Sequence, residues 1–214
     1  MINMTTMTNH TLLSRLNGRK PMGKSSGFTL IEVMVSIVIF SIGLIGIARL
    51  QVVAKQSNYD AVQRVAATSL AQDMLARMRS NHSELGTYVS NNGETIILGN
   101  ANAATPANTC GNSGNPCSTL QLATHDLWEI ERAMIGIAEQ DTDGNNTGGL
   151  VSPTMCITGP AAGTSGVYTV AIAWRGKAAL TNSIRSDCGN DRDLYGDANV
   201  YRRVIVMETF ITSI

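Results

Sequence analysis

The sequence lacks the motifs on which most enzyme and metal-site assignments rest. It contains no pair of histidines at metal-binding spacing and no C-x-x-C pair, and from Phe28 onward it has no G-x-S-x-G nucleophile motif. After residue 27 the only histidines are His82 and His125. Ser113 and Ser165 lie in glycine-containing loops with no candidate base nearby in the sequence. We therefore expect a protein that is not an enzyme, with no catalytic residue, no bound metal and no cofactor.

Positive charge is scarce once the N-terminal residues are set aside. From Phe28 onward the chain has 12 basic and 16 acidic residues, which leaves a net charge of −4. A chain of that charge is too acidic for a general nucleic-acid binder, so we do not expect nucleic acid as a direct ligand. The residues before Phe28 carry only positive charges. These are Arg15, Arg19, Lys20 and Lys24.

Proline is absent between Pro21 and Pro106, so nothing in that interval forces a helix to break. Residues 28–50 (FTLIEVMVSIVIFSIGLIGIARL) are almost wholly apolar, and residues 33–48 include no charge. This length matches the ~20 residues that a helix needs to cross a bilayer. No A-x-A-like cleavage site follows, as it would after an ordinary secretory signal. The basic residues before the segment predict that the N-terminal end stays in the cytoplasm.

The apolar pattern continues beyond the expected membrane segment on one helix face. Apolar residues recur at steps of three and four from Val52 to Met78, with charged residues between them. This spacing predicts an amphipathic helix that ends near Ser80. A continuous helix from Phe28 to Ser80 would be about 80 Å long. We expect four residues of its apolar stripe to face a core: Val62, Val65, Ala66 and Leu70.

The remainder of the chain, residues 81–214, has the pattern of an α+β domain. Residues 81–116 read as loop with short strands, one of them at Ile96–Leu98. Asp126–Gln140 has the spacing of a short second helix, with Thr124 or Asp126 as its cap. Segments rich in β-branched and aromatic residues predict antiparallel strands at residues 155–158, 167–174 and 200–211. One face of such a sheet would cover the amphipathic helix.

Four cysteines fall in this last part: Cys110, Cys117, Cys156 and Cys188. An even number in a chain with an export-type start favours disulfides formed in an oxidising compartment. Three pairings are possible, and sequence order favours Cys110–Cys117 and Cys156–Cys188. A zinc site would require thiolates at tighter spacings.

Two further groups invite a functional interpretation. Asp141 to Asn145 (DTDGN) resembles the start of a calcium loop, but an EF-hand needs glycine at its sixth position and glutamate at its twelfth. Here those positions hold Asn146 and Ser152, so we expect a solvated turn. Arg202 and Arg203 form a basic pair that we expect on the solvent face of a strand, with DNA contact as the weaker alternative.

The segment Gly27-Phe28-Thr29-Leu30-Ile31-Glu32, followed by the apolar run, resembles the class III signal of type IV prepilins and pseudopilins. The resemblance implies that a prepilin peptidase cuts between Gly27 and Phe28 and methylates the new Phe28 amine. It also implies that Glu32 serves filament assembly, by pairing with the Phe28 amine of a neighbouring subunit. A carboxylate in a membrane segment costs on the order of a few kcal/mol, so such a partner is expected. The alternative is a Glu32 that faces lipid headgroups at the interface.

The same resemblance implies a type IV pilin fold, in which a long N-terminal helix, with its first half in the membrane, packs on an antiparallel sheet. Residues 1–27 would be the leader, 28–50 the transmembrane and filament-core half of the helix, 51–80 its amphipathic half and 81–214 the head. The start could be Met1 or Met22. Expected partners are minor and major pilins, prepilin peptidase and the inner-membrane assembly platform. The protein would span the inner membrane once with its head in the periplasm, and then enter the pilus.

Residues 41–51 resemble the PilV group of minor pilins more than a major pilin, and the segments 126–128, 168–170, 174–176 and 201–204 fit the same group. This implies a low-copy subunit that helps to prime pilus assembly and supports twitching motility, adhesion or DNA uptake. One alternative is a pseudopilin of a type II secretion system. Another is an enzyme or binding domain that is merely tethered by a signal anchor.

Overall fold

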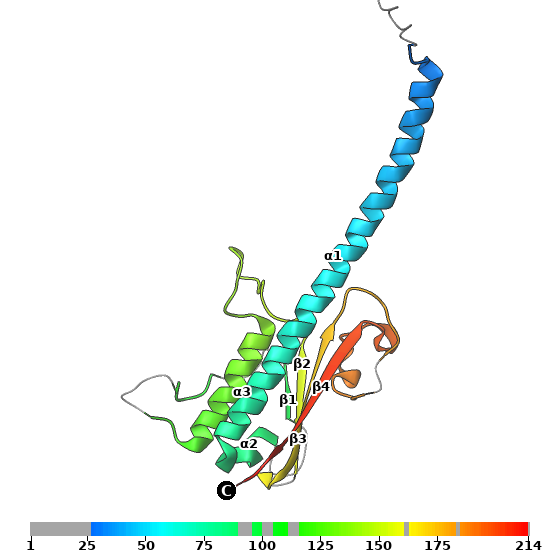
Figure 1. Ribbon diagram of the computed structural model, residues 1–214. Helices are drawn as coiled ribbons and strands as arrows, with labels where there is room; N and C mark the ends of the chain where they lie inside the picture. Colours follow the sequence, from blue (N-terminus) through cyan, green and yellow to red (C-terminus); the bar gives the residue numbers. More distant parts are fainter. Residues whose placement is uncertain are drawn as a thin grey trace, which may run out of the picture. The chain divides into compact units, whose positions relative to one another are not determined.

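The computed structural model of the protein describes residues 27–89, 96–99, 105–110, 116–160, 163–182 and 185–213. The predicted leader lies outside these residues except for Gly27. The chain forms two compact units, one up to Ala48 and one from Arg49 to Ile214. The border falls inside a single helix, α1 (Leu30–Ser80) (Figure 1).

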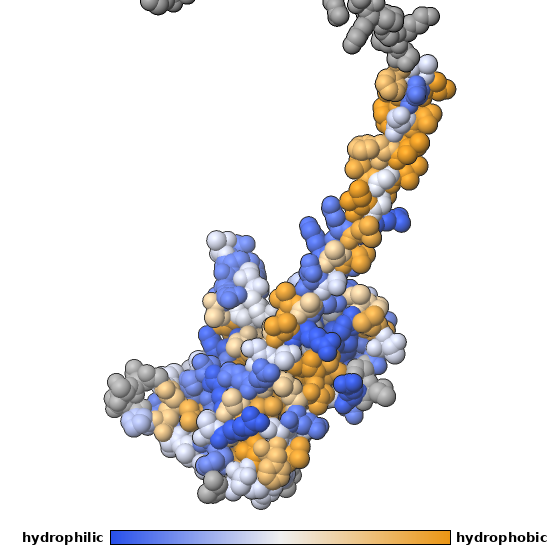
Figure 2. Space-filling view, in the orientation of Figure 1, coloured by the Kyte–Doolittle hydropathy of each residue, from blue (hydrophilic) through white to orange (hydrophobic). Residues whose placement is uncertain are grey.

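The described part of the first unit is exposed along its whole length, Phe28 by 82% and Leu30 by 79%. Figure 2 shows apolar side chains along most of its visible surface. Among the described residues, α1 is the one helix that is long and apolar enough to cross a membrane. The hydroxyls of Ser36 and Ser41 donate to the carbonyls of Glu32 and Ile37, at 2.7 Å each. Both serine hydroxyls therefore donate within the helix and leave no unpaired donor on its apolar surface. Only lipid or other helices can cover that surface.

The second unit is built on a four-stranded antiparallel sheet in the order β1-β2-β3-β4. Its strands are β1 (Ile96–Leu98), β2 (Thr154–Thr158), β3 (Gly166–Arg175) and β4 (Arg202–Ile211). Met155 pairs with Ile172, and Ile172 with Ile205. Because side chains alternate across a strand, this row faces the main core, while Cys156 and Ala171 face the opposite side.

The helices of the second unit share one core with the inner face of the sheet. α3 (Thr119–Ile135), η1 (His82–Glu84) and α2 (Leu85–Val89) lie beside the C-terminal half of α1 (Figure 1). Two single-turn 3-10 helices, η3 (Asn190–Arg192) and η4 (Asp197–Asn199), interrupt the long connection between β3 and β4. The prediction of an α+β fold, with a long apolar N-terminal helix packed on an antiparallel sheet, is confirmed.

The second long helix begins and ends earlier than the predicted Asp126–Gln140. Ser118 caps α3 through a capping box, since its hydroxyl accepts from the Gln121 N–H and the Gln121 side chain accepts from the Ser118 N–H. Gly136 ends the helix in the left-handed region, at φ 69°, which glycine adopts without strain. Thr124 and Asp126 are therefore interior residues and cap nothing. The Ser-x-x-Gln motif that begins at Ser118 marks the start of α3. The apolar spacing is clearer further along the chain and therefore favoured a later start.

Two other predictions need correction. Residues 82–89 were expected in loop and strand but form η1 and α2, and β4 begins at Arg202 rather than Val200. The buried face of α1 is also shifted, because Val62 and Val65 are 65% and 70% exposed. The residues buried instead are Gln63, Ala67, Ala71, Met74, Leu75 and Met78.

Gln63 explains much of this shift of the buried face. Its Nε2 donates to the Gly149 carbonyl and its Oε1 accepts from the Val151 N–H, both at 3.1 Å. Burial of a polar side chain costs little free energy when its donor and its acceptor are both hydrogen-bonded. The loop after α3 can therefore draw Gln63 inward and leave the two valines outside.

Candidate functional site

The junction between Gly27 and Phe28 lies just before α1, in a part of the chain that is neither helix nor strand. Gly27 is exposed, and a Cβ built on it would meet no atom within 4 Å. The Phe28 side chain is also exposed. The peptide bond between these residues is thus sterically open, which is what a protease that binds extended chain requires.

Glu32 lies in the first turn of α1, where Thr29 caps the helix. The Thr29 carbonyl accepts from the Glu32 N–H at 3.1 Å and from the Val33 N–H at 3.2 Å. The Thr29 hydroxyl lies 3.3 Å from the same Glu32 nitrogen and 3.5 Å from Glu32 Oε2. The Thr29 hydroxyl therefore serves as an N-cap acceptor for the Glu32 N–H, and the positive end of the helix dipole favours an acid here. Glu32 thus has a local role in starting the helix that the sequence reasoning did not consider.

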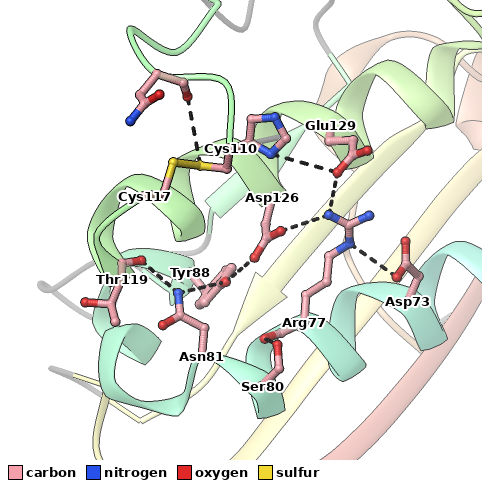
Figure 3. Close-up of polar contacts among 12 residues, drawn as sticks. Asp73, Arg77, Ser80, Asn81, Tyr88, Cys110, Cys117, Thr119, Asp126 and Glu129 are labelled. Atoms are coloured by element: carbon pink, nitrogen blue, oxygen red, sulfur yellow. Dashed lines mark hydrogen bonds and ion pairs between the residues drawn. A yellow bond between two sulfur atoms is a disulfide. The ribbon is translucent and has the colours of Figure 1, made fainter. Parts of the chain in front are cut away.

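A partly buried network of charges joins α1 to α3 and α2 (Figure 3). Arg77 of α1 donates to Asp126 at 2.8 Å and to Glu129 at 2.6 Å, and it forms an ion pair with Asp73 at 3.2 Å. Burial lowers the pKa of Arg77, but its hydrogen bonds to these three carboxylates outweigh burial and hold the pKa above its ordinary value. The network therefore fixes the helices to each other with Arg77 fully charged.

The inner end of the same network is the hydroxyl of Tyr88. It donates to Asp126 Oδ2 at 2.5 Å and lies 3.3 Å from the Asn81 side-chain amide, which also donates to the Thr119 carbonyl at 2.8 Å (Figure 3). Burial raises the pKa of Tyr88, and the hydrogen bond to Asp126 raises it further. Sequence reasoning missed this cluster because residues that bond to each other in it are up to 52 positions apart.

His125, Asp126 and Glu129 could in principle ligate a metal, since one ligand atom from each lies within 4.8 Å of the others. However, Asp126 already accepts from Arg77 and Tyr88, and Glu129 accepts from Arg77. A cation placed here would meet the Arg77 guanidinium at close range. The chemistry of this cluster is that of a structural ion network.

Both disulfides of the structure follow the pairing that sequence order favours, Cys110–Cys117 and Cys156–Cys188. The first closes a loop before α3, with a sequence separation of 7 residues. The second joins β2 to the connection between β3 and β4 across 32 residues. Cys156 and Cys188 are 7% and 6% exposed, so the second disulfide forms part of the packing on the outer face of the sheet.

The prediction that Arg202 faces solvent is wrong, because this residue is only 2% exposed. Its guanidinium donates to the Ser186 and Cys188 carbonyls and to Asn182 Oδ1, at 2.6 to 2.9 Å. Arg203 is also half-buried and donates to the Ala178 carbonyl at 2.6 Å. These arginines hold the connection between β3 and β4 against the sheet, and the buried Arg202 offers no free surface to DNA.

The loop after α3 is a closed polar turn. Asp141 Oδ1 accepts from the backbone N–H groups of Asp143 and Asn145, and its Oδ2 accepts from the Asn145 side chain. The hydrogen bonds from Asn145 lower the pKa of Asp141. This arrangement is the solvated turn expected from the sequence.

A long apolar helix with an open Gly-Phe junction, joined to an α+β head, defines a pilin-type filament subunit. Two family models match the chain: the prokaryotic N-terminal methylation motif at residues 22–48 and the Tt1218-like family, described as type IV pilin Tt1218, at residues 49–128. Comparisons with curated proteins and with solved structures gave no significant match. The chain is a protein of the type IV pilin family, which is structural and not enzymatic. The methylation motif implies processing by a prepilin peptidase and assembly with other pilins.

Proposed function

We propose that this protein is a minor pilin of a type IV pilus, of the PilV kind, that takes part in priming pilus assembly. The observation that carries the proposal is the lone carboxylate of Glu32 in the first turn of an otherwise apolar, fully exposed helix. Such a surface needs lipid or other apolar helices around it. Through assembly, the protein would support twitching motility, adhesion or DNA uptake.

In this proposal the prepilin peptidase removes residues 1–27 and methylates the new Phe28 amine. Residues 28–50 then anchor the subunit in the inner membrane, while residues 51–80 and the head, 81–214, stand in the periplasm. When the subunit leaves the membrane through the assembly platform, Glu32 pairs with the Phe28 amine of a neighbouring pilin. The Glu32 charge would be neutralised in a single axial register of the subunits. It would therefore specify how the subunits align more than it would stabilise the filament.

Two measurements test the proposal. Mass spectrometry of the mature protein should find a chain that starts at methylated Phe28. Glu32→Gln should reduce recovery of the protein in sheared filaments at least tenfold, since the uncharged amide cannot neutralise the amine. Glu208→Gln, a change of the same kind at an exposed position of the head, should leave recovery unchanged. An uncut Gly27–Phe28 bond, or normal incorporation of Glu32→Gln, would contradict the proposal.

A pseudopilin of type II secretion would use the same N-terminal physics in a short periplasmic filament. The match to a type IV pilin model across residues 49–128 supports the pilus. A deletion strain separates the two, because we expect it to lose twitching while exoprotein release continues. Loss of secretion with normal pili would overturn the choice.

A further inference from the structure

A hollow of about 560 Å³ opens on the second unit where α1 meets the ends of β3 and β4. We call it the basic hollow. It is lined chiefly by Asp60, Arg64, Trp174, Leu180, Arg185 and Arg203. None of these residues belongs to the N-terminal signal or to the ion network of Figure 3.

Positive charge predominates in the basic hollow although the chain from Phe28 onward is acidic. Three arginines face a single acid, Asp60, which is already engaged. Its Oδ1 accepts from the Lys177 N–H at 3.2 Å, and its Oδ2 lies 3.8 Å from Arg203. Among the described residues the Arg64 guanidinium has no hydrogen-bond or ion-pair partner, and its side chain is exposed. The hollow can therefore take an anion without displacing an existing ion pair.

Trp174 supplies a second and independent sign of a ligand. This residue is 3% exposed and lines the same hollow. Within the described part of the chain, its indole Nε1 is the one buried side-chain nitrogen or oxygen without a hydrogen-bond partner. Buried donors in folded proteins are almost always paired. An acceptor oxygen that reaches the indole edge from the hollow would satisfy this donor.

We propose that the basic hollow binds a carboxylate side chain presented by the head of a neighbouring pilin subunit. Guanidinium groups donate paired N–H bonds to planar carboxylates, and the indole N–H adds a neutral donor. The exposed Leu180 gives the aliphatic part of a glutamate an apolar surface. The inference rests on the proposed function, because a subunit meets neighbouring heads only when it assembles.

A lipid phosphate is less suited to this position. Arg64 lies 15 residues along α1 from Arg49, the first charge after the apolar run, which is about 22 Å of helix. The headgroup layer on one side of a bilayer is only roughly 5–8 Å thick. A phosphate held in the membrane surface would therefore not reach the hollow.

The binding test uses the full-length chain in detergent micelles with Trp128→Phe, which leaves Trp174 as the only tryptophan. Titration with N-acetylglutamate α-amide at constant ionic strength should give a saturable change in Trp174 emission. Arg64→Ala should weaken that binding about tenfold. Lys55→Ala is the matched control, because nine residues place Lys55 on the opposite face of α1, and it should bind like the parent.

Three outcomes would overturn the proposal. The first is an emission change that does not saturate, and the second is equal binding by the Arg64→Ala variant. The third is tighter binding of inorganic phosphate than of the carboxylate probe, which would make the hollow a phosphate site.

A second test in cells separates this inference from the proposed function. Arg64→Glu should reduce incorporation into filaments at least fivefold while processing at Phe28 stays normal, and Lys55→Glu should not. If the parent protein is absent from filaments, the proposed function fails, whatever the micelle titration shows. If the parent and Arg64→Glu enter filaments equally, the role of the hollow in assembly fails and the pilin assignment stands.

Discussion

Asp126 has a carboxylate that is almost out of contact with water, at 4% exposure of the residue. A buried carboxylate without hydrogen-bond donors would destabilise the folded state. Here one oxygen accepts from Arg77 and the other from Tyr88. The two donors differ in kind, because Arg77 is charged at any ordinary pH whereas Tyr88 must keep its proton to donate. The network is therefore sensitive to alkali at one residue.

Tyr88→Phe should make the stability of the head less dependent on alkaline pH. Burial and the bond to Asp126 raise the pKa of Tyr88 in the folded state, above the value of about 10 in an unfolded chain. The folded state then holds the proton more tightly, so the contribution of Tyr88 is complete below about pH 10 and declines as the pH rises towards the folded pKa. The phenylalanine variant lacks this decline.

The measurement is denaturant unfolding of the full-length protein in micelles between pH 8 and pH 11. At pH 8 the variant should already be less stable by about 1–2 kcal/mol, since Asp126 loses one donor. Burial also raises the pKa of Tyr168 and Tyr195, so the variant should keep part of the alkaline decline. An unchanged pH slope in Tyr88→Phe would show that Tyr88 is not the alkali-sensitive member of the network.

The described residues of the connection between β3 and β4 form only two single-turn 3-10 helices, yet several bonds tie this connection to the rest of the second unit. The Cys156–Cys188 disulfide, the buried Arg202 and the bond from Arg203 to Ala178 all tie it to the sheet. Lys177 ties it to α1, where its ammonium lies 4.9 Å from the centre of the Tyr59 ring. These ties keep one wall of the basic hollow in place.

Removal of the two disulfides should have unequal effects. In the chain-entropy model a bridge across 32 residues contributes about 3.7 kcal/mol, and a bridge across 7 residues about 2.4 kcal/mol. The double variant Cys156→Ser/Cys188→Ser should therefore lose more unfolding free energy than Cys110→Ser/Cys117→Ser. Burial of Cys156 and Cys188 increases the difference, because serine in their place puts hydroxyls into an apolar contact. Denaturant titration of both variants measures the order, and equal losses would contradict this account.

At the scale of the whole molecule, the two units have opposite relations to solvent. The second unit buries its own core, whereas the described part of the first buries nothing within the chain. The head can therefore bury its apolar side chains in its own core. The apolar side chains of the helix up to Ala48 need lipid or other helices, which this chain does not supply.

Replacement of residues 28–48 by an unrelated apolar membrane helix should leave the head folded. Protease resistance and disulfide formation should match the parent, because the core lies within residues 49–214. Recovery in sheared filaments should fall below detection, since the chimera lacks the Gly-Phe junction and Glu32. A chimera that still enters filaments would favour the rival view of a functional head on an interchangeable anchor.

Features that depend on neighbouring residues could be predicted from the amino-acid sequence. The long helix follows from apolar spacing without proline, the strands from β-branched runs, and the processing signal from six consecutive residues. These signals are local, because helix and strand periods repeat within a few positions. The bounds of α3 were misplaced, because a short capping motif preceded the clearer apolar pattern, and the short helices at residues 82–89 and the start of β4 were also misassigned.

Tertiary structure alone decided which side chains became buried and which partners they met. Gln63 displaced Val62 and Val65 from the core because a loop 86 positions away offered its backbone. Arg202 is buried for the same reason, because the Cys188 carbonyl accepts from its guanidinium. Trp174 lies beside Arg64 because β3 packs on α1. Burial of a polar group depends on a partner that satisfies it, and such a partner can lie anywhere in the chain.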